Sequence, residues 1–394
     1  MAFPSYQYFS RLYDKISAYR TKYHDEGRKV ASKLVYWNLK FLLSTFGKRA
    51  NAHIKSGFMD NLQHISIRIA GGLGDHIINA KYISSLAEYI GKDTVFDILA
   101  ETEDIDFLKA IYNDKSYIQQ IIPNGCETEY DLALYVVRFP KVLSYHKERL
   151  SMRTLKYVEQ LKKFEIEHYL LLENDFLGRC YSLLKGRKRE NQADIGNILQ
   201  MAQQQFLLKA PKNSYDTLQK FGLQKNCFIT LQTGSGRHFR QINPEVRQWP
   251  AEYYAQLAIM LKRKYPRYKI VQLGDEEQQK IANIDIDLRG KTDYSELLIL
   301  LKEAKLHIAQ ESGMIFLRHF LQGGVSVVLF GPTDINFFGY TENLNLSASL
   351  CDQPCEWIVK NWMEKCVKTG NEAECMRLLV PEKVFNRICE RNFL

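Results

Sequence analysis

Short apolar runs alternate with longer segments in which apolar residues recur every three or four positions, and this alternation occurs twice along the chain. Runs of the first kind predict strands, and runs of the second kind predict amphipathic helices. In the first series we predict strands at 64–70, 94–100, 118–122 and 130–136 and helices at 79–89 and 106–112. An apolar run at 167–172 and a helical pattern through residue 184 follow.

The second series has the clearer pattern. It predicts strands at 227–231, 268–273, 284–288, 306–309 and 325–330 and helices at 250–264, 294–304 and 314–321. Alternation of this kind is typical of parallel sheets with helices on both faces. The sequence therefore predicts the α/β class, with two Rossmann-like domains facing a central cleft. Ligands of such sheets bind beyond the carboxyl ends of the strands.

The length of 394 residues is too great for one ordinary core. We expect a basic helical extension at 1–60, Rossmann-like domains at 61–220 and 221–350, and a cysteine-containing tail with a C-terminal helix at 351–394. No run of eighteen apolar residues appears, and the first residues lack the apolar core of a signal peptide. We therefore expect a cytoplasmic protein whose eight cysteines are free or metal-bound.

The positive charge is concentrated at the start of the chain. Residues 1–60 hold eleven Lys and Arg against four Asp and Glu, a surplus of seven out of the net charge of +9. A basic amphipathic helix with aromatic residues can lie on an anionic membrane, so we expect peripheral attachment at the inner face of the cytoplasmic membrane. The alternatives are an arm packed on its own protein and a dimer contact. Nucleic-acid binding is not expected, because no reading module is recognisable.

A glycine-rich turn, IRIAGGLGDHIINAKYI at 67–83, follows the first predicted strand. It lacks the full frame of a dinucleotide-binding fingerprint, and it places Asp75 where a phosphate cradle would need no carboxylate. Asp75 is either a functional carboxylate or a cap for the following helix. The adjacent His76 is either a packing residue or a ligand for an anionic group of an acceptor.

A second loop, LQTGSGRHFR, follows the strand at 227–231 and continues into RQWP. Its small residues permit close backbone approach, and its cations suit a diphosphate. The candidate ligands are Thr233, Gly234, Ser235 and Arg247. A solvated basic loop is the alternative.

A third turn, QESG, follows the strand at 306–309 and begins a helix. Glu311 can accept hydrogen bonds from ribose hydroxyls, while the N–H groups of Ser312 and Gly313 can face a phosphate. The alternative is that Glu311 and Ser312 only cap the helix.

A family resemblance appears when the motifs are taken in order: GGLGDH, TGSG, RQWP, QLGDEEQ, GKTDYSEL, AQESGM and VVLFGPTD. Over residues 64–385 the chain resembles glycosyltransferase family 9, the ADP-heptose:lipopolysaccharide heptosyltransferase family, which has the GT-B fold. The resemblance implies an inverting enzyme that moves a sugar, most simply heptose, from a nucleotide-diphosphate donor such as ADP-heptose. The implied acceptor is a lipid-linked or oligosaccharide glycan of the lipopolysaccharide or lipooligosaccharide core, or another surface polymer.

The resemblance also assigns roles to residues. Asp75 is implied as the general base on the acceptor hydroxyl, with Gly72 and Gly74 beside the acceptor, and Arg247 as a ligand of the donor phosphates. Glu311 replaces the usual Asp, and Phe316 replaces a usual His, for which Arg318 or His319 on the same helix can compensate.

The basic stretch at 185–189 is expected to be an exposed loop, in which Lys185, Arg187 and Lys188 can bind an acidic acceptor. The alternative is that this loop is only solvated.

Four cysteines, Cys351, Cys355, Cys366 and Cys375, cluster in the tail. They can hold a structural Zn²⁺ or iron ion, or they are free buried thiols. No cofactor or metal is expected to be required for catalysis, because no D-x-D pair is placed to hold a diphosphate-bound cation. A GT-B-fold nucleotide-sugar epimerase and a non-catalytic glycan-binding relative are the competing functions.

Overall fold

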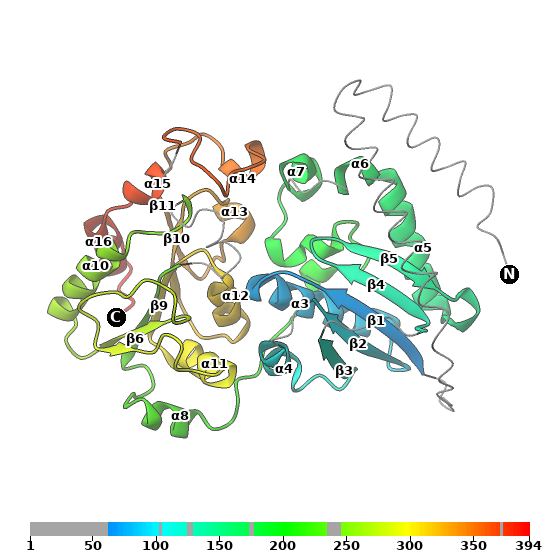
Figure 1. Ribbon diagram of the computed structural model, residues 1–394, viewed down its shortest axis with the longest axis horizontal. Coiled ribbons are helices and arrows are strands. Elements are labelled where there is room, and N and C mark those ends of the chain that lie inside the picture. The colour runs from blue at the N-terminus through cyan, green and yellow to red at the C-terminus, as the bar shows by residue number, and fades with distance from the viewer. Residues whose placement is uncertain (1–61, 102–104, 124–128, 173–176, 235–245, 371–372) are drawn as a thin grey trace. The chain divides into compact units, whose positions relative to one another are not determined.

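The computed structural model describes residues 62–101, 105–123, 129–172, 177–234, 246–370 and 373–394 (Figure 1). All of them fall in one compact unit, Asn61–Leu394. The predicted basic helical extension falls in the other unit, Met1–Asp60, and lies outside the described residues.

The first sheet has the strand order β3-β2-β1-β4-β5 (Figure 1). Its strands are β1 (Gln63–Ile69), β2 (Thr94–Ala100), β3 (Ile118–Pro123), β4 (Leu132–Val136) and β5 (Pro140–Tyr145). The first four are parallel, whereas β5 is antiparallel to β4 and was not predicted. The apolar residues of β1 are completely buried, as is typical of a strand covered on both faces.

The helices of this part of the chain surround that sheet. They are α3 (Leu73–Ile90), α4 (Asp106–Tyr112), α5 (Met152–Glu167), α6 (Tyr169–Leu172) and α7 (Tyr181–Leu184). Short 3-10 helices are η1 (Lys147–Arg149), η2 (Leu177–Cys180), η3 (Arg189–Asp194) and η4 (Met201–Gln203). The apolar run at 167–172 is therefore the end of one helix and a second short helix.

The second sheet is parallel throughout, with the order β11-β10-β9-β6-β7-β8. Its strands are β6 (Phe228–Gln232), β7 (Lys269–Leu273), β8 (Ile286–Asp287), β9 (Leu306–Gln310), β10 (Ser326–Phe330) and β11 (Leu344–Ser347). Counted from β6, this is the 3-2-1-4-5-6 order of a Rossmann domain. The two sheets confirm the predicted α/β class with two Rossmann-like domains.

The second domain and the tail contribute the remaining helices. They are α8 (Ser214–Lys220), α10 (Ala251–Lys264), α11 (Tyr294–Glu303), α12 (Gly313–Phe320), α13 (Ile335–Phe338), α14 (Cys355–Ile358), α15 (Glu374–Arg377) and α16 (Pro381–Glu390). Helix α11 begins with a capping box, because the Asp293 carboxylate accepts from Glu296 N at 2.8 Å and the Glu296 carboxylate accepts from Asp293 N at 3.1 Å. The indole of Trp249 donates to Leu379 O at 2.7 Å and so ties the tail to the second domain.

Candidate active site

Two glycine-containing turns meet where the domains touch. The turn after β1 leads into α3, the turn after β9 leads into α12, and the two helices contact each other (Figure 1). A Cβ atom on Gly313 would lie 2.7 Å from Gly74 N, and one on Gly74 would lie 3.3 Å from Gly313 Cα. Only glycine allows this approach. Each turn leaves the carboxyl end of a strand beside a change in strand order, which is where ligands of such sheets bind.

Asp75 projects from the first turn of α3. Its Oδ2 accepts from Gly72 N at 3.0 Å, and its Oδ1 accepts from Arg189 Nη2 at 2.6 Å. The carboxylate therefore caps the helix, as the alternative interpretation of the sequence required. It also remains 37% exposed, whereas the arginine side chain is only 8% exposed. An accessible carboxylate, held at both oxygens, can still receive a proton from a bound hydroxyl.

His76 does not face a ligand. The residue is buried, and its ring packs on Phe107 with 4.9 Å between centroids. Burial lowers its pKa to about 4, although the nearby Asp75 carboxylate opposes this shift. The structure thus corrects the expectation that His76 binds an anionic acceptor group, because the imidazole is neutral and covered.

The basic stretch at 185–189 is not the exposed loop that we expected. Lys185 is exposed and stays a candidate acceptor ligand. Arg187 donates to the carbonyls of Asp194 and Ile195 at 3.2 and 2.9 Å, and Lys188 donates to Gly339 O at 2.5 Å. Both of these predicted acceptor ligands are used within the fold, because unpaired backbone carbonyls attract the nearest cations.

Arg247 and Glu311 lie together at the carboxyl ends of the second sheet. Arg247 Nη2 is 2.5 Å from Glu311 Oε2 and donates to Glu311 O at 3.1 Å. Both side chains are mostly buried, and the guanidinium lies over Trp362 at 5.6 Å from the ring centroid. The structure therefore brings together two residues that the sequence assigned to one donor site.

Ser312 is the N-cap residue of α12, but its side chain makes no capping bond. Its hydroxyl donates instead to Gln232 Oε1 at 2.9 Å. The amide of Gln232 also donates to Gly234 O at 3.0 Å, and Gly234 has φ +86°. A buried amide therefore connects the two loops that flank β6 and β9, and capping does not explain the hydroxyl of Ser312.

Thr233 is placed differently from our expectation. It is buried, donates to Gln279 O at 2.8 Å and accepts from Gln272 Nε2 at 3.3 Å. Its hydroxyl is thus used in holding the loop after β7 rather than offered to a diphosphate. Ser235 lies outside the described residues.

The helix face that lacks the family histidine is filled by aromatic rings. Phe316 is buried against Phe338 and Tyr340, with 6.4 and 5.8 Å between ring centroids. Arg318 is fully buried and donates to the carbonyls of Leu301, Ala304 and Val325. It cannot compensate for the missing histidine, because its guanidinium is used by backbone carbonyls at the end of α11 and just before β10.

His319 was predicted to bind the donor, but its ring nitrogens face two carboxylates. Nδ1 is 2.5 Å from Glu342 Oε1, and Nε2 is 3.6 Å from Glu190 Oε2. The ring also stacks on Tyr340 at 3.5 Å. These contacts correct the prediction, since an imidazole held by two anions is not free to meet a phosphate.

Two residues near the site were not predicted. The sequence predicts Arg189 as part of an exposed loop. Glu356 lies in the tail and belongs to no sequence motif. Its Oε1 accepts from Asp334 N at 2.8 Å, and its Oε2 has no hydrogen-bond partner within the described part of the chain. Burial, followed by the carboxylates of Glu311 and Asp334, raises the pKa of Glu356 to about 8. The tail therefore supplies an acid next to the Arg247–Glu311 pair.

The four tail cysteines are free and lie near one another. Burial and the neighbouring thiols, Cys351 first, raise the pKa of Cys355 to about 11, and burial and all three other thiols raise that of Cys375 to about 12. Burial acts to raise the pKa of Cys366, but hydrogen bonds from Thr369 and Lys368 outweigh it, so this pKa lies below its usual value. No group of three or more His, Cys, Asp or Glu in the described ranges is arranged to hold a metal ion.

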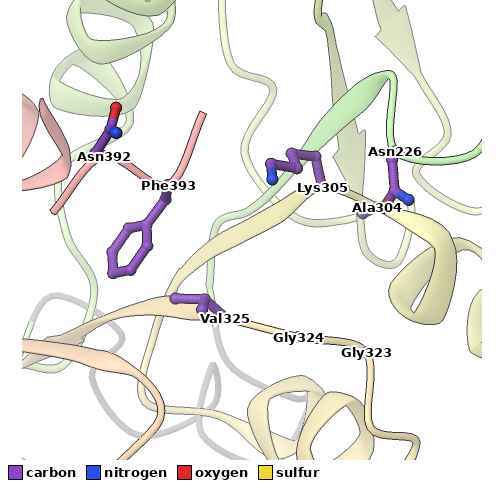
Figure 2. A pocket seen from close by; sticks show the side chains of 8 residues that line it. All are labelled: Asn226, Ala304, Lys305, Gly323, Gly324, Val325, Asn392 and Phe393. Atoms are coloured by element: carbon purple, nitrogen blue, oxygen red, sulfur yellow. The ribbon is translucent and has the colours of Figure 1, made fainter.

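A cavity of about 370 Å³ lies elsewhere (Figure 2). Figure 2 shows Asn226, Lys305 and Val325, which precede β6, β9 and β10, together with Asn392 and Phe393 from the end of the chain. The cavity therefore lies at the amino ends of the strands, opposite to the edge that carries the candidate site.

Comparisons with known proteins show the fold of the chain and a family match over part of it. The glycosyl transferase family 9 structure from Veillonella parvula DSM 2008 superposes with a TM-score of 0.55, at 15% identity, over 85% of this chain and 98% of that one. TibC of enterotoxigenic E. coli H10407, described as an iron-containing dodecameric glycosyltransferase, gives a TM-score of 0.52 at 15% identity, over 84% of this chain and 76% of its own. A complex of TibC with ADP-D-β-D-heptose gives 0.53 at 14% identity, over 85% and 78%. The search of curated proteins gives no match.

These superpositions show that the fold is GT-B, as predicted. The model of glycosyltransferase family 9 (heptosyltransferase) matches residues 191–374. This segment of the chain is thus similar to that family, in agreement with the resemblance noted in the sequence.

Proposed function

We propose that the protein is an inverting glycosyltransferase that transfers heptose from ADP-heptose to a lipopolysaccharide or lipooligosaccharide core, or to another surface glycan. One observation carries the proposal. The turn that bears Asp75 and the turn that bears Glu311 meet through Gly74 and Gly313, so a carboxylate and a cation-containing site lie on the two sides of one contact.

In the proposed reaction Asp75 removes the proton from the acceptor hydroxyl as that oxygen attacks the anomeric carbon. The carbon develops oxocarbenium character while the bond to the diphosphate breaks, and a single displacement inverts the configuration. The diphosphate takes up negative charge as it leaves. Arg247 and the N–H groups at the start of α12 are the donors proposed to stabilise it.

The donor is proposed from the family and from the site. The family model describes heptosyltransferases, and the TibC complex contains ADP-D-β-D-heptose. Glu311, which directly follows β9, is proposed to accept hydrogen bonds from ribose hydroxyls when its partner Arg247 turns to the diphosphate. A thermal-shift screen of ADP-, UDP-, GDP- and CMP-sugars tests this choice, because a bound ligand raises the melting temperature according to its concentration relative to Kd.

Transfer to a lipooligosaccharide acceptor, measured for wild type and Asp75→Asn, tests the activity. We expect kcat to fall about 10²- to 10⁴-fold in the variant, while the Kd for ADP-heptose stays unchanged. Asp106→Asn is the matched control, because Asp106 also lies in the first turn of a helix of the same domain and forms an exposed ion pair with Lys109. Full activity of Asp75→Asn would refute the assignment of the base. Turnover of the nucleotide sugar without an acceptor would indicate the epimerase.

We also propose that residues 1–60 hold the enzyme at the inner face of the cytoplasmic membrane. Their surplus of seven positive charges supports attraction to anionic lipids. Among the helices described, none is long and apolar enough to cross a bilayer. Co-sedimentation with anionic liposomes should be lost on deleting 1–60, and equal sedimentation of both forms would exclude this role.

The cysteine tail is proposed to hold a structural iron or zinc ion. TibC is described as iron-containing, and the tail of this chain carries Cys351, Cys355, Cys366 and Cys375 within 25 residues. In the described ranges these thiols are not arranged around an ion, so the proposal requires that metal binding bring them together. Four thiolates are a donor set that both metals accept, and the ion would stabilise the tail. Metal analysis of the purified protein should find about one ion per chain, lost together with thermal stability in Cys355→Ser.

A further inference from the structure

Residues 188–190 contact both domains of the described unit. Lys188 Nζ donates to Gly339 O at 2.5 Å in the second domain. Arg189 Nη2 binds Asp75 Oδ1 at 2.6 Å in the first. Glu190 contacts both, because its Oε1 accepts from Lys81 at 2.8 Å and its Oε2 lies 3.6 Å from His319 Nε2. We call residues 188–190 the bridging segment.

Glu190 fixes the bridging segment in place. Its partner Lys81 is 4% exposed and also donates to Asn191 Oδ1 at 2.8 Å, so two neighbouring residues are held by one buried cation on α3. On the other side His319 is itself held by Glu342 and by stacking on Tyr340. The backbone at 189 is therefore fixed between α3 and α12, the two helices whose first turns form the site.

A fixed backbone at residue 189 also fixes the side chain that binds Asp75. Gly72 N holds one carboxylate oxygen and Arg189 holds the other, and the arginine side chain is 8% exposed. A carboxylate with two fixed donors keeps one rotamer, and small displacements of a reacting group cost large factors in rate. Arg189 cannot be the base itself, because a guanidinium does not give up its proton in proteins.

From this geometry, and resting on the proposed function, we infer that Arg189 is a positioning residue that aims the Asp75 carboxylate at the acceptor hydroxyl. Because the bridging segment is held by both α3 and α12, the position of the Arg189 guanidinium depends on how these two helices are packed. The base would thus be correctly aimed only when the two domains are joined.

Arg189→Met and Arg189→Lys test the inference with full-length protein, ADP-heptose and the acceptor. We expect Arg189→Met to lower kcat about 10- to 100-fold, with the KM for ADP-heptose within about twofold of wild type. Arg189→Lys keeps a cation and should recover part of the loss. Arg387→Met is the matched control, because that arginine is paired with Glu390 on the surface of α16. An unchanged thermal shift with ADP-heptose confirms that each variant is folded.

A double-mutant cycle separates positioning from a general structural effect. If Arg189 acts through Asp75, Arg189→Met should cause no further loss of kcat in the Asp75→Asn background. An equal loss in both backgrounds, or wild-type kcat in Arg189→Met, would overturn the inference while the low kcat of Asp75→Asn still supports the proposed base. A fully active Asp75→Asn would instead refute the proposed function itself.

Discussion

The two turns that form the candidate site are built alike but are charged differently. Each leaves the carboxyl end of a parallel strand and contains a glycine in contact with the other turn. Each also carries an acidic residue near the start of its helix: Asp75 in the first turn of α3 and Glu311 just before Ser312, the N-cap of α12. In the second turn Glu311 is paired with Arg247 of its own domain. In the first turn Asp75 is paired with Arg189, which lies 114 residues away in the bridging segment.

The two ion pairs differ in whether they depend on the contact between the domains. The Arg247–Glu311 pair is 12% and 8% exposed and belongs to one domain, so it persists however the domains are arranged. The Asp75–Arg189 pair is accessible on its carboxylate side, and its cation is held from both domains. In the proposed reaction the leaving group would therefore bind at a preformed site, whereas the proton would be removed at a site that depends on the packing of α3 on α12.

Substitution of Gly313 by Ala should have the largest effect. The new Cβ would lie 2.7 Å from the backbone nitrogen of Gly74, which cannot turn aside, so α3 and α12 must separate. Gly313 does not have a positive φ, so the substitution brings no backbone strain of its own. We expect transfer to fall at least about 100-fold, because Asp75 moves away from the donor turn.

Gly222→Ala is the control for that substitution, because Gly222 has φ +62° and open space around its Cα. It should reduce stability slightly and leave transfer unchanged. Nearly normal transfer in Gly313→Ala would show that the two turns need not touch for catalysis. Proton removal would then not depend on the packing of α3 on α12.

The sequence predicted those parts of the fold whose signals are local. The strand at 94–100 and the helix at 106–112 have the predicted bounds, and the strands and helices between 227 and 330 agree within two residues at nearly every end. Parallel strands buried on both faces give continuous apolar runs, and these runs are the strongest pattern available. The antiparallel β5 was not predicted, because its residues are mostly half-buried and include Pro140, Lys141 and Ser144, so they form no continuous apolar run.

The contacts between segments distant in sequence could not be predicted. Arg189 stands in a run of basic residues, and such runs are usually solvated. Its role depends on Glu190 and Lys81 meeting across 109 residues. By their positions in the sequence, Thr233 and His319 are expected to bind the sugar donor. In the fold, Thr233 is instead bonded to Gln272 and to the backbone of Gln279, and His319 faces the carboxylates of Glu190 and Glu342. The positions of Asp75 and Glu311 near the carboxyl ends of strands could be predicted, because each residue lies in a strand–turn–helix unit that is continuous in sequence.

Acid should weaken the first turn through His76. Its pKa is about 4 in the folded protein and 6.5 when unperturbed, so folding favours the neutral ring. The stability from this group is present above pH 6.5 and is lost as the pH falls toward 4, by about 3 kcal/mol at most. His76→Phe, which keeps the contact with Phe107, should reduce the acid dependence of the free energy of unfolding by about that amount.

Denaturant titrations from pH 7 to pH 4 measure this dependence. His307 in β9, whose pKa burial and the nearby Arg318 lower to about 3, adds acid sensitivity to the second domain in every variant. A slope that His76→Phe leaves unchanged would show that acid acts on the two turns equally.

Removal of the second turn's cation should affect donor binding rather than the transfer step. Arg247→Met takes away the guanidinium proposed to meet the diphosphate and leaves Glu311, which is 8% exposed, without that partner. We expect the Kd for ADP-heptose to rise about 10- to 100-fold by calorimetry. Lys262→Met, which breaks a surface pair with Asp285, is the control. A fall in kcat at unchanged Kd would assign Arg247 to the same role as Arg189 and remove the contrast between the turns.

The smallest effect is expected at Ser312, where the two turns differ in how they begin their helices. Asp75 caps α3 from its third helical position, whereas Ser312 gives its hydroxyl to Gln232 Oε1 at 2.9 Å and leaves α12 uncapped by a side chain. Ser312→Ala should lower the free energy of unfolding by about 1 kcal/mol and leave the Kd for ADP-heptose unchanged, because it leaves a buried amide oxygen unpaired. In a Gln232→Met background the same substitution should cost almost nothing. A full cost in that background would mean that the hydroxyl caps α12, and the two helices would then begin alike.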